Sequence, residues 1–469
     1  MASYPTTSWS SLPVEMKLAV TNSLDEQDIR ALSLVDQSTY SACLPALFKN
    51  IRLSSCVALE NFLENVPRDY HRFIRSLDIC AHSENESLNK NHLVLTELVT
   101  SLLVGCRSLE DLTLSIPGSL NYTFVSCFRH LSELKYLAIC NAVPEEISPL
   151  QVFLHFDFDY SPLTSFRYRS ERFVVSIAAS IPKLEHLSLD CVSRSVMHAP
   201  ELHGVYPYVP LVSDDHVIPD HPVLGSDLYL PALLRIPTLR ELTIQNTHLG
   251  DPRWATEPVA CRLEVLDLGS CCHEDEYSNS KCIQRIMTAV GRTVGEFSLT
   301  TSVSDTVFAK PTATPMQRLR KLHISPFFPV DDVVDTMANL AGSPIESLSM
   351  QCFEDDVVDV CTAIEEFLSL RVERGPNFYG KLSRIDVSIT VQDGFIPAID
   401  AESNAERFRA TKHLQEFCRD LRLASHFQKA SPLGSGRASR GRSSSFAADL
   451  RWPSINTSVV DGRSRSMTI

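Results

Sequence analysis

Side chains that could bind a metal ion gather at two places in the chain. The first is Cys271-Cys-His-Glu-Asp-Glu276, which lacks the second ligand pair that a zinc site requires. The second lies within residues 192–230, where seven such side chains have no regular spacing: His198, His203, His216, His221, Asp214, Asp215 and Asp220. Polar residues without a pattern normally stay in water. We therefore interpret both segments as polar loops and expect no metal.

Motifs for covalent catalysis and phosphate binding are lacking. Gly291-Arg-Thr-Val-Gly295 has two glycines, but neither the Gly-Lys-Ser/Thr ending nor the preceding strand of a phosphate-binding loop. The sequence contains no G-x-S-x-G and no H-E-x-x-H. We therefore predict that the chain is not an enzyme, with no catalytic residue and no cofactor. Because a Ser/His/Asp triad needs no local spacing, an enzyme built on residues 192–230 is one alternative.

The composition indicates a folded, acidic protein. The 469 residues include 43 Lys and Arg against 57 Asp and Glu, and the resulting charge of −14 argues against general nucleic-acid binding. Apolar residues make up 44% of the chain, yet none of their runs reaches the roughly 18–20 residues of a membrane span. The start of the chain lacks the basic and apolar regions of a secretory signal. The 14 cysteines include no CxxC pair, so we expect reduced thiols and a cytoplasmic or nuclear location, or both.

A repeat of the form apolar-x-x-apolar-x-apolar dominates the middle of the chain. Six clear copies begin at Leu109, Leu134, Leu184, Leu239, Leu263 and Leu319. Five weaker copies begin at Ile74, Leu163, Val294, Ile345 and Leu382. The last two apolar positions of each copy share one face of a strand, and the residues between them share the other. The repeat therefore predicts strands with one buried apolar face and one polar face that meets solvent.

Helical patterns separate these strands and complete an α/β unit. Apolar residues recur at helical spacing over residues 93–104, 173–181, 282–290 and 356–368. Strand, loop and helix in this order predict a right-handed α/β solenoid, with parallel strands inside and helices outside. Each repeat can bury its apolar residues only by stacking on its neighbours.

The remaining segments define the other predicted parts of the chain. Residues 54–399 form the predicted solenoid, and the aperiodic stretch at about 192–230 is a long surface insertion. Residues 400–427 have an amphipathic pattern that predicts a capping helix. Residues 428–469 are rich in Ser and Arg, and we expect them to be disordered.

Residues 9–53 are predicted to form three short helices. Pro13 suits the first position of a helix, and Glu15 falls in the first turn, where the helix dipole favours an anion. Asp25 and Asp36 are candidate N-caps of the second and third helices, and Pro45 is expected to end the third. A module of this size is marginal as an independent fold, and its apolar residues exceed what a small core can hide. These two properties predict that the module docks onto another protein.

Two resemblances to known families emerge from these motifs. Residues 72–390 resemble irregular leucine-rich-repeat proteins, with Cys or Asn following the third apolar position only in some copies. The N-terminal module resembles an F-box, particularly that of fungal proteins. The match runs through Leu12-Pro13-x-Glu15-Met16, Val20, Leu24, Asp28-Ile29, Leu32, Leu34-Val35, Leu44-Pro45-x-Leu47-Phe48, Ile51 and Leu53.

The F-box resemblance implies a substrate-recognition subunit of an SCF-type cullin–RING ubiquitin ligase. It implies that the module binds the adaptor subunit, and through it a cullin, by Leu12, Pro13, Glu15, Met16, Val20, Leu24, Leu32 and Val35. An unidentified target protein would then bind the concave polar face, where the candidates are Asp111, Thr113, Tyr136, His186, Ser188, Glu241, Thr243, Asp267, Lys321, His323, Arg384 and Asp386. Neither nucleic acid nor membrane is an expected partner. The alternative is a leucine-rich-repeat scaffold or inhibitor that acts independently of ubiquitin.

Overall fold

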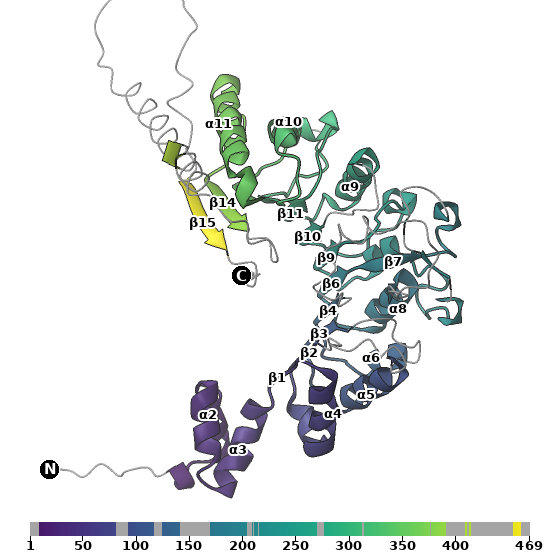
Figure 1. The fold of residues 1–469 in the computed structure, drawn as a ribbon, viewed down its shortest axis with the longest axis vertical. Coiled ribbons are helices and arrows are strands. Elements are labelled where there is room, and N and C mark those ends of the chain that lie inside the picture. The colour runs from purple at the N-terminus through teal and green to yellow at the C-terminus, as the bar shows by residue number, and fades with distance from the viewer. Residues whose placement is uncertain are drawn as a thin grey trace, which may run out of the picture. The chain divides into compact units, whose positions relative to one another are not determined.

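The structure of the chain is a computed structural model. It describes residues 9–80, 92–116, 124–140, 169–203, 209, 211–213, 215–269, 276–311, 314–375, 377–390, 409, 412–413 and 454–460. The chain divides into two compact units, Met1–Leu239 and Arg240–Ile469. Each unit combines helices with parallel strands, so the predicted α/β class is confirmed (Figure 1).

The first unit begins with three helices, as the sequence predicts. They follow a short 3-10 helix, η1 (Trp9–Ser11), and they are α1 (Val14–Thr21), α2 (Glu26–Ser33) and α3 (Gln37–Leu47). Both predicted caps are confirmed, because Asp25 accepts a hydrogen bond from the Asp28 N–H and Asp36 accepts one from the Thr39 N–H, each 2.8 Å long. The prediction that Pro45 ends the third helix is wrong by two residues. Proline lacks a donor but can lie inside a last turn, and α3 ends at Leu47.

Helix α3 is the centre of the N-terminal module and its link to the rest of the unit. Helices α1 and α2 both pack against α3. The Trp9 indole N–H donates to the Thr39 hydroxyl over 2.8 Å. Beyond α3, Phe48 packs on Tyr70 with ring centroids 5.3 Å apart. Tyr70 belongs to η2 (Arg68–Phe73), which follows α4 (Cys56–Asn65).

Five parallel strands of the first unit follow one another in chain order. They are β1 (Asn50–Leu53), β2 (Ser76–Cys80), β3 (Asp111–Ser115), β4 (Tyr136–Cys140) and β6 (His186–Asp190). The helices between them lie on one side of the strands in Figure 1, and they are α4, α5 (His92–Gly105), α6 (Val125–Phe128) and α8 (Glu171–Ser180). Leu77, Leu112, Leu137 and Leu187 occupy the same register position, and all four are buried.

The segment from 192 to 230 was expected to be a surface loop, and this expectation is wrong. It contains strand β7 (Val192–Ser195), which is wholly buried and pairs in parallel with β5 (Arg169–Ser170) and β8 (Leu211–Val212). The 3-10 helices η5 (Pro200–Leu202), η6 (Asp215–Val217) and η7 (Leu230–Arg235) complete it. Buried Ile218, Leu224 and Leu228 supply apolar contacts that have no period in the sequence.

The second unit repeats the strand-and-helix plan. Its strands are parallel and lie in the order β9 (Glu241–Gln245), β10 (Val265–Leu268), β11 (Glu296–Leu299), β12 (Lys321–Ile324), β13 (Ser347–Phe353), β14 (Arg384–Thr390) and β15 (Ser454–Val460). Its main helices are α9 (Glu276–Val290), α10 (Val333–Leu340) and α11 (Val357–Arg374). Its 3-10 helices are η8 (Pro252–Ala255), η9 (Thr306–Ala309), η10 (Val330–Asp332) and η11 (Glu354–Asp356).

The same pattern of backbone hydrogen bonds joins the start of each strand to the strand before it. The Arg75 carbonyl accepts from the N–H groups of both Glu110 and Asp111, and the Glu110 carbonyl accepts from those of Lys135 and Tyr136. The second unit repeats this arrangement from Arg240 onwards. Such repetition shows that the predicted copies are equivalent structural positions. Ten of the eleven copies form strands, and the copy that begins at Leu163 lies outside the described residues.

Two predictions concern the end of the chain. The prediction that all of residues 428–469 are disordered is wrong for Ser454–Val460, which form β15 beside β14. This stretch is rich in β-branched residues, and pairing with β14 satisfies its backbone groups. The predicted capping helix at 400–427 lies outside the described residues except at Arg409, Lys412 and His413, which are helical.

Candidate functional site

Five exposed apolar side chains form a surface on the N-terminal module, which we call the module surface. They are Val14, Met16, Val20, Leu34 and Val35, which are 62%, 53%, 39%, 87% and 66% exposed. Of the predicted adaptor-binding residues, Pro13, Glu15, Met16, Val20 and Val35 are exposed, whereas Leu12, Leu24 and Leu32 are half-buried. Five of the eight residues are therefore accessible on the module, and the other three are partly covered by it.

Helix α1 buries polar side chains and leaves apolar ones exposed, unlike an ordinary surface helix. Its buried residues are Lys17 and Thr21, while Val14, Met16 and Val20 face outwards. Lys17 is accommodated because its ammonium lies 5.8 Å from the Trp9 ring centroid, and the Thr21 hydroxyl donates to the Leu18 carbonyl. A helix that only packed on its own chain would normally bury its apolar stripe. In α1, by contrast, apolar side chains are left in contact with water.

The predicted recognition residues lie on the polar faces of the strands in both units. In the first unit Asp111, Thr113, Tyr136, His186 and Ser188 alternate with fully buried leucines and isoleucines. In the second unit the same alternation places seven residues on the open face: Glu241, Thr243, Asp267, Lys321, His323, Arg384 and Asp386. The period-two argument made from the sequence is thus confirmed for all twelve side chains.

An ion cluster occupies the open face of the second unit. The Glu296 carboxylate accepts hydrogen bonds from the Lys321 ammonium at 2.9 Å and from His323 Nε2 at 2.7 Å. The hydrogen bond with His323 is the main reason why the pKa of Glu296 falls to about 2, and Lys321 lowers it further against the opposing effect of burial. The cluster keeps Glu296 ionised at every physiological pH.

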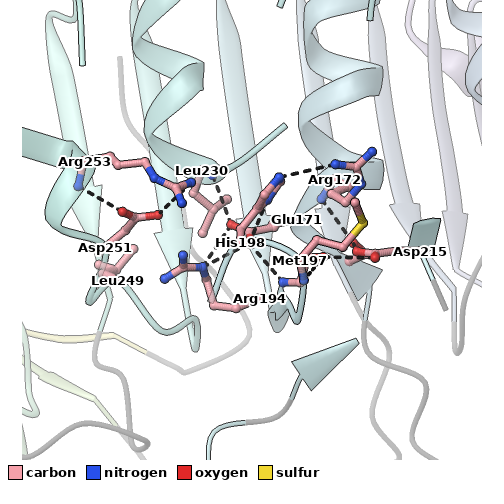
Figure 2. Close-up of polar contacts among 12 residues, drawn as sticks. Glu171, Arg172, Arg194, Met197, His198, Asp215, Leu230, Leu249, Asp251 and Arg253 are labelled. Carbon is pink, nitrogen blue, oxygen red and sulfur yellow. Dashed lines mark hydrogen bonds and ion pairs between the residues drawn. The ribbon is translucent and has the colours of Figure 1, made fainter. Parts of the chain in front are cut away.

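A second polar cluster is buried inside the first unit (Figure 2). Glu171, at the start of α8, accepts hydrogen bonds from Arg194 Nε at 3.0 and 3.1 Å, from the Ser195 N–H at 2.9 Å and from the Leu230 N–H at 3.2 Å. His198 Nδ1 lies 3.4 Å from the same carboxylate. Burial would raise the pKa of Glu171, but the hydrogen bond with His198 and the charge of Arg194 outweigh it and lower the pKa.

Asp215 and Arg172 extend this cluster across the 192–230 segment. Asp215 accepts from the hydroxyls of Ser195, at 2.9 Å, and Ser170. The Arg172 guanidinium donates to the Ile218 carbonyl at 3.1 Å and lies 3.3 Å from His198 Nε2. Because the carboxylates are buried and engaged by these donors, the cluster holds β7, η6 and η7 against α8.

The histidines of this segment do not converge on one site. His198 joins the buried cluster, His203 and His216 are exposed, and the buried His221 accepts from the N–H groups two and three residues beyond it. Among the described residues, no group of three or more His, Cys, Asp and Glu side chains could hold a metal ion. The Cys271–Glu276 candidate falls outside this test, because residues 270–275 are not described.

Gly291 has a packing role that its motif did not reveal. A Cβ atom at this position would lie 2.6 Å from the Met287 carbonyl oxygen and 2.6 Å from the Met316 sulfur. This close approach explains the glycine without a bound phosphate. The Glu171 cluster gives no signal in the sequence, because an acidic residue in a first turn is common on helix surfaces.

Comparisons with known proteins leave the family open. No family model matches the chain, and no curated protein matches it either. None of the described helices is both long enough and apolar enough to cross a membrane.

Proposed function

We propose that the protein is the substrate-recognition subunit of an SCF-type cullin–RING ubiquitin ligase. In this proposal the module surface binds the adaptor, and through it the cullin. The strands and helices of each unit form irregular leucine-rich repeats, and the polar faces of the strands bind a target protein. The chain makes and breaks no bond itself. It raises the effective concentration of the target beside the ubiquitin carrier of the ligase.

The reversed polarity of α1 is the observation that supports the adaptor contact most directly. Val14, Met16 and Val20 stay partly in water in the chain alone, whereas a partner groove would remove their exposed parts from water. Leu34 and Val35, between α2 and α3, extend the same apolar surface. Apolar residues presented by short helices are a common way to dock into a groove of another protein.

The polar faces of the strands support target binding. Their side chains stand on a backbone that regular parallel pairing holds rigid, so a target would meet preorganised groups. Mixed charges, such as Glu296, Lys321 and His323, favour selection of a complementary surface over non-specific attraction.

The test measures binding of the intact chain to the purified small adaptor subunit of an SCF ligase. We expect a stable complex, and we expect Met16→Glu or Val35→Glu to weaken it by at least about tenfold, because a charge would be buried against an apolar groove. Val57→Glu is the matched control, since Val57 lies on α4 outside the module and is 63% exposed. All three substitutions are at exposed positions, so the folded state should tolerate them.

Two outcomes would overturn the proposal. One is an intact chain that does not bind the adaptor at micromolar concentrations. The other is equal loss of binding in Val57→Glu and Val35→Glu, which would show that a general effect of added charge is responsible. Target binding that survives deletion of residues 9–53, without any adaptor binding by the intact chain, would favour the scaffold alternative.

A further inference from the structure

Phe327, which is exposed, and Phe353, which is half-buried, form an aromatic pair in the second unit. Their ring centroids are 5.2 Å apart and the ring planes meet at 73°, an edge-to-face arrangement. Phe353 is the last residue of β13, and Phe327 lies three residues beyond the neighbouring strand β12. Phe327 is 61% exposed. The pair therefore presents the Phe327 ring to water, packed on the half-buried Phe353 ring, at the carboxyl ends of two parallel strands.

Neither ring is needed to complete the core at this place. The adjacent residue Phe328 is buried, so it fills the interior while Phe327 faces outwards. Along β13, buried Met350 and Cys352 alternate with Ser349, Gln351 and Phe353, so Phe353 is on the open face. Other open-face positions of this strand carry small or polar side chains. An aromatic ring here has the properties of an anchor for a bound partner.

Acidic residues follow both members of the aromatic pair in the chain. Residues 326–340 contain three Asp or Glu and residues 351–370 contain six, with no Lys or Arg in either stretch. The two stretches come together because η10, which holds Asp331 and Asp332, packs against α11. The pKa of Asp356 is raised by burial and by the negative charges of Asp355 and Asp359. The surface thus combines an exposed ring with negative charges that repel one another.

We propose that this surface binds an arginine-bearing segment of a partner protein through Phe327, Phe353, Asp331 and Asp332. A guanidinium can stack on an exposed ring while its N–H groups donate to carboxylates beside it. Arginine fits better than lysine because its cation is planar and less strongly hydrated. The arginine-bearing segment would belong to the target protein, so its biological role rests on the proposed function. The surface itself is tested without the adaptor, so the two proposals can fail separately.

The test uses the intact chain and a fluorescein-labelled peptide of nine residues in which three arginines alternate with serine and glycine. Fluorescence anisotropy should detect binding that weakens as salt is added. A peptide in which citrulline, a neutral analogue of the same shape, replaces arginine should bind at least about tenfold more weakly. Phe327→Ala and the double change Asp331→Asn with Asp332→Asn should each weaken binding of the arginine peptide by about tenfold.

Two control variants report on unrelated loss of surface or charge. Glu373→Gln removes one carboxylate near the other end of α11, about 24 Å from its start at 1.5 Å per residue. Val259→Ala trims another exposed apolar side chain of the same unit. Both should bind the peptide as the unaltered chain does, and circular dichroism should show that every variant is folded.

Three results would overturn the inference. The first is equal binding of the citrulline and arginine peptides, and the second is equal binding by Phe327→Ala and the unaltered chain. The third is arginine binding that appears only when residues 461–469 are deleted. These residues contain Arg463 and Arg465. That result would assign the surface to the C-terminus of the chain itself instead of to a partner.

Discussion

Replacing Glu171 with glutamine tests whether the buried cluster holds the 192–230 segment in place. Oε1 accepts from Arg194 and the Ser195 N–H, and Oε2 accepts from Arg194 and the Leu230 N–H. An amide has only one oxygen, so either orientation in Glu171→Gln directs its NH₂ group at the guanidinium and at one backbone donor. The change also leaves Arg194 buried without its carboxylate. Breaking a buried ion pair in this way costs about 3–5 kcal/mol.

Hydrogen exchange of the intact chain is the appropriate assay, because a protein of two units need not unfold in one step. A loss of 3–5 kcal/mol should speed exchange in β7 and η7 by roughly 100- to 4,000-fold if these elements open together. Asp227→Asn is the matched control. It removes the partner of Arg235 from a partly exposed ion pair of 3.0 Å in the same segment, and should change exchange by less than about fivefold.

The pH dependence provides an independent check of the same reasoning. The folded-state pKa of Glu171 is lowered, so its stabilisation is fully present above the unfolded-state pKa. This stabilisation is lost only as the pH falls through the folded-state value. Protection of β7 should therefore persist at pH 5 in the unaltered chain. Exchange in Glu171→Gln that rises by less than tenfold would refute the claim that the cluster anchors the segment.

Three further predictions concern single contacts. Gly105→Ala would place a Cβ atom 2.8 Å from the buried His71 ring, and thermal unfolding should show a loss of about 1–3 kcal/mol; an unchanged midpoint would contradict the packing. The folded-state pKa of Glu296 is lowered to about 2, so the stability that Glu296 gives the folded chain is complete above its unfolded-state pKa near 4.5 and disappears toward pH 2. A Glu296 pKa above 4, measured by NMR, would contradict its hydrogen bond with the His323 imidazole. Tyr379→Phe removes a buried 2.7 Å hydrogen bond to the Met337 carbonyl and should cost about 1–3 kcal/mol by urea unfolding; no change in the urea midpoint would contradict it.

The strands were predictable from the sequence because their physical requirement is local. Successive side chains of a strand point to opposite faces, so burying the leucines fixes which face of the strand meets the core. Leu112 and Leu114 of β3 are buried in this way. The helix caps were predictable for the same reason, since Asp25 and Asp36 accept from donors three residues away. Sequence neighbours alone determine these features.

The buried cluster and the aromatic pair could not be predicted because their partners are distant in the chain. Glu171 meets Arg194 and the Leu230 N–H only after β7 and η7 have folded against α8. Phe327 and Phe353 meet because β12 and β13 pair in register. Nothing within a few residues of either ring indicates the other. A surface on repeated strands combines side chains that are distant in the sequence. The repeat can therefore be identified from the sequence when the molecule that it binds cannot.

The size of the module surface sets what apolar contact can contribute to the proposed adaptor complex. The exposed parts of Val14, Met16, Val20, Leu34 and Val35 amount to about three whole side chains, and burying them contributes roughly 5–9 kcal/mol. Association costs an estimated 4–15 kcal/mol, a range that overlaps the apolar contribution, so any polar contact would add directly to the affinity.

Glu15 is the best placed residue to make such a polar contact. It is exposed in the first turn of α1, between Val14 and Met16. Glu15→Gln keeps the size of the side chain but removes its charge, so we expect adaptor affinity to fall about tenfold and the salt dependence of binding to decrease. Val14→Ala, in comparison, should leave the salt dependence unchanged, because it removes only apolar area. If Glu15→Gln bound the adaptor with unaltered affinity and salt dependence, then the adaptor contact would have to be apolar alone. That result would contradict the expectation that Glu15 makes a charged contact with the adaptor.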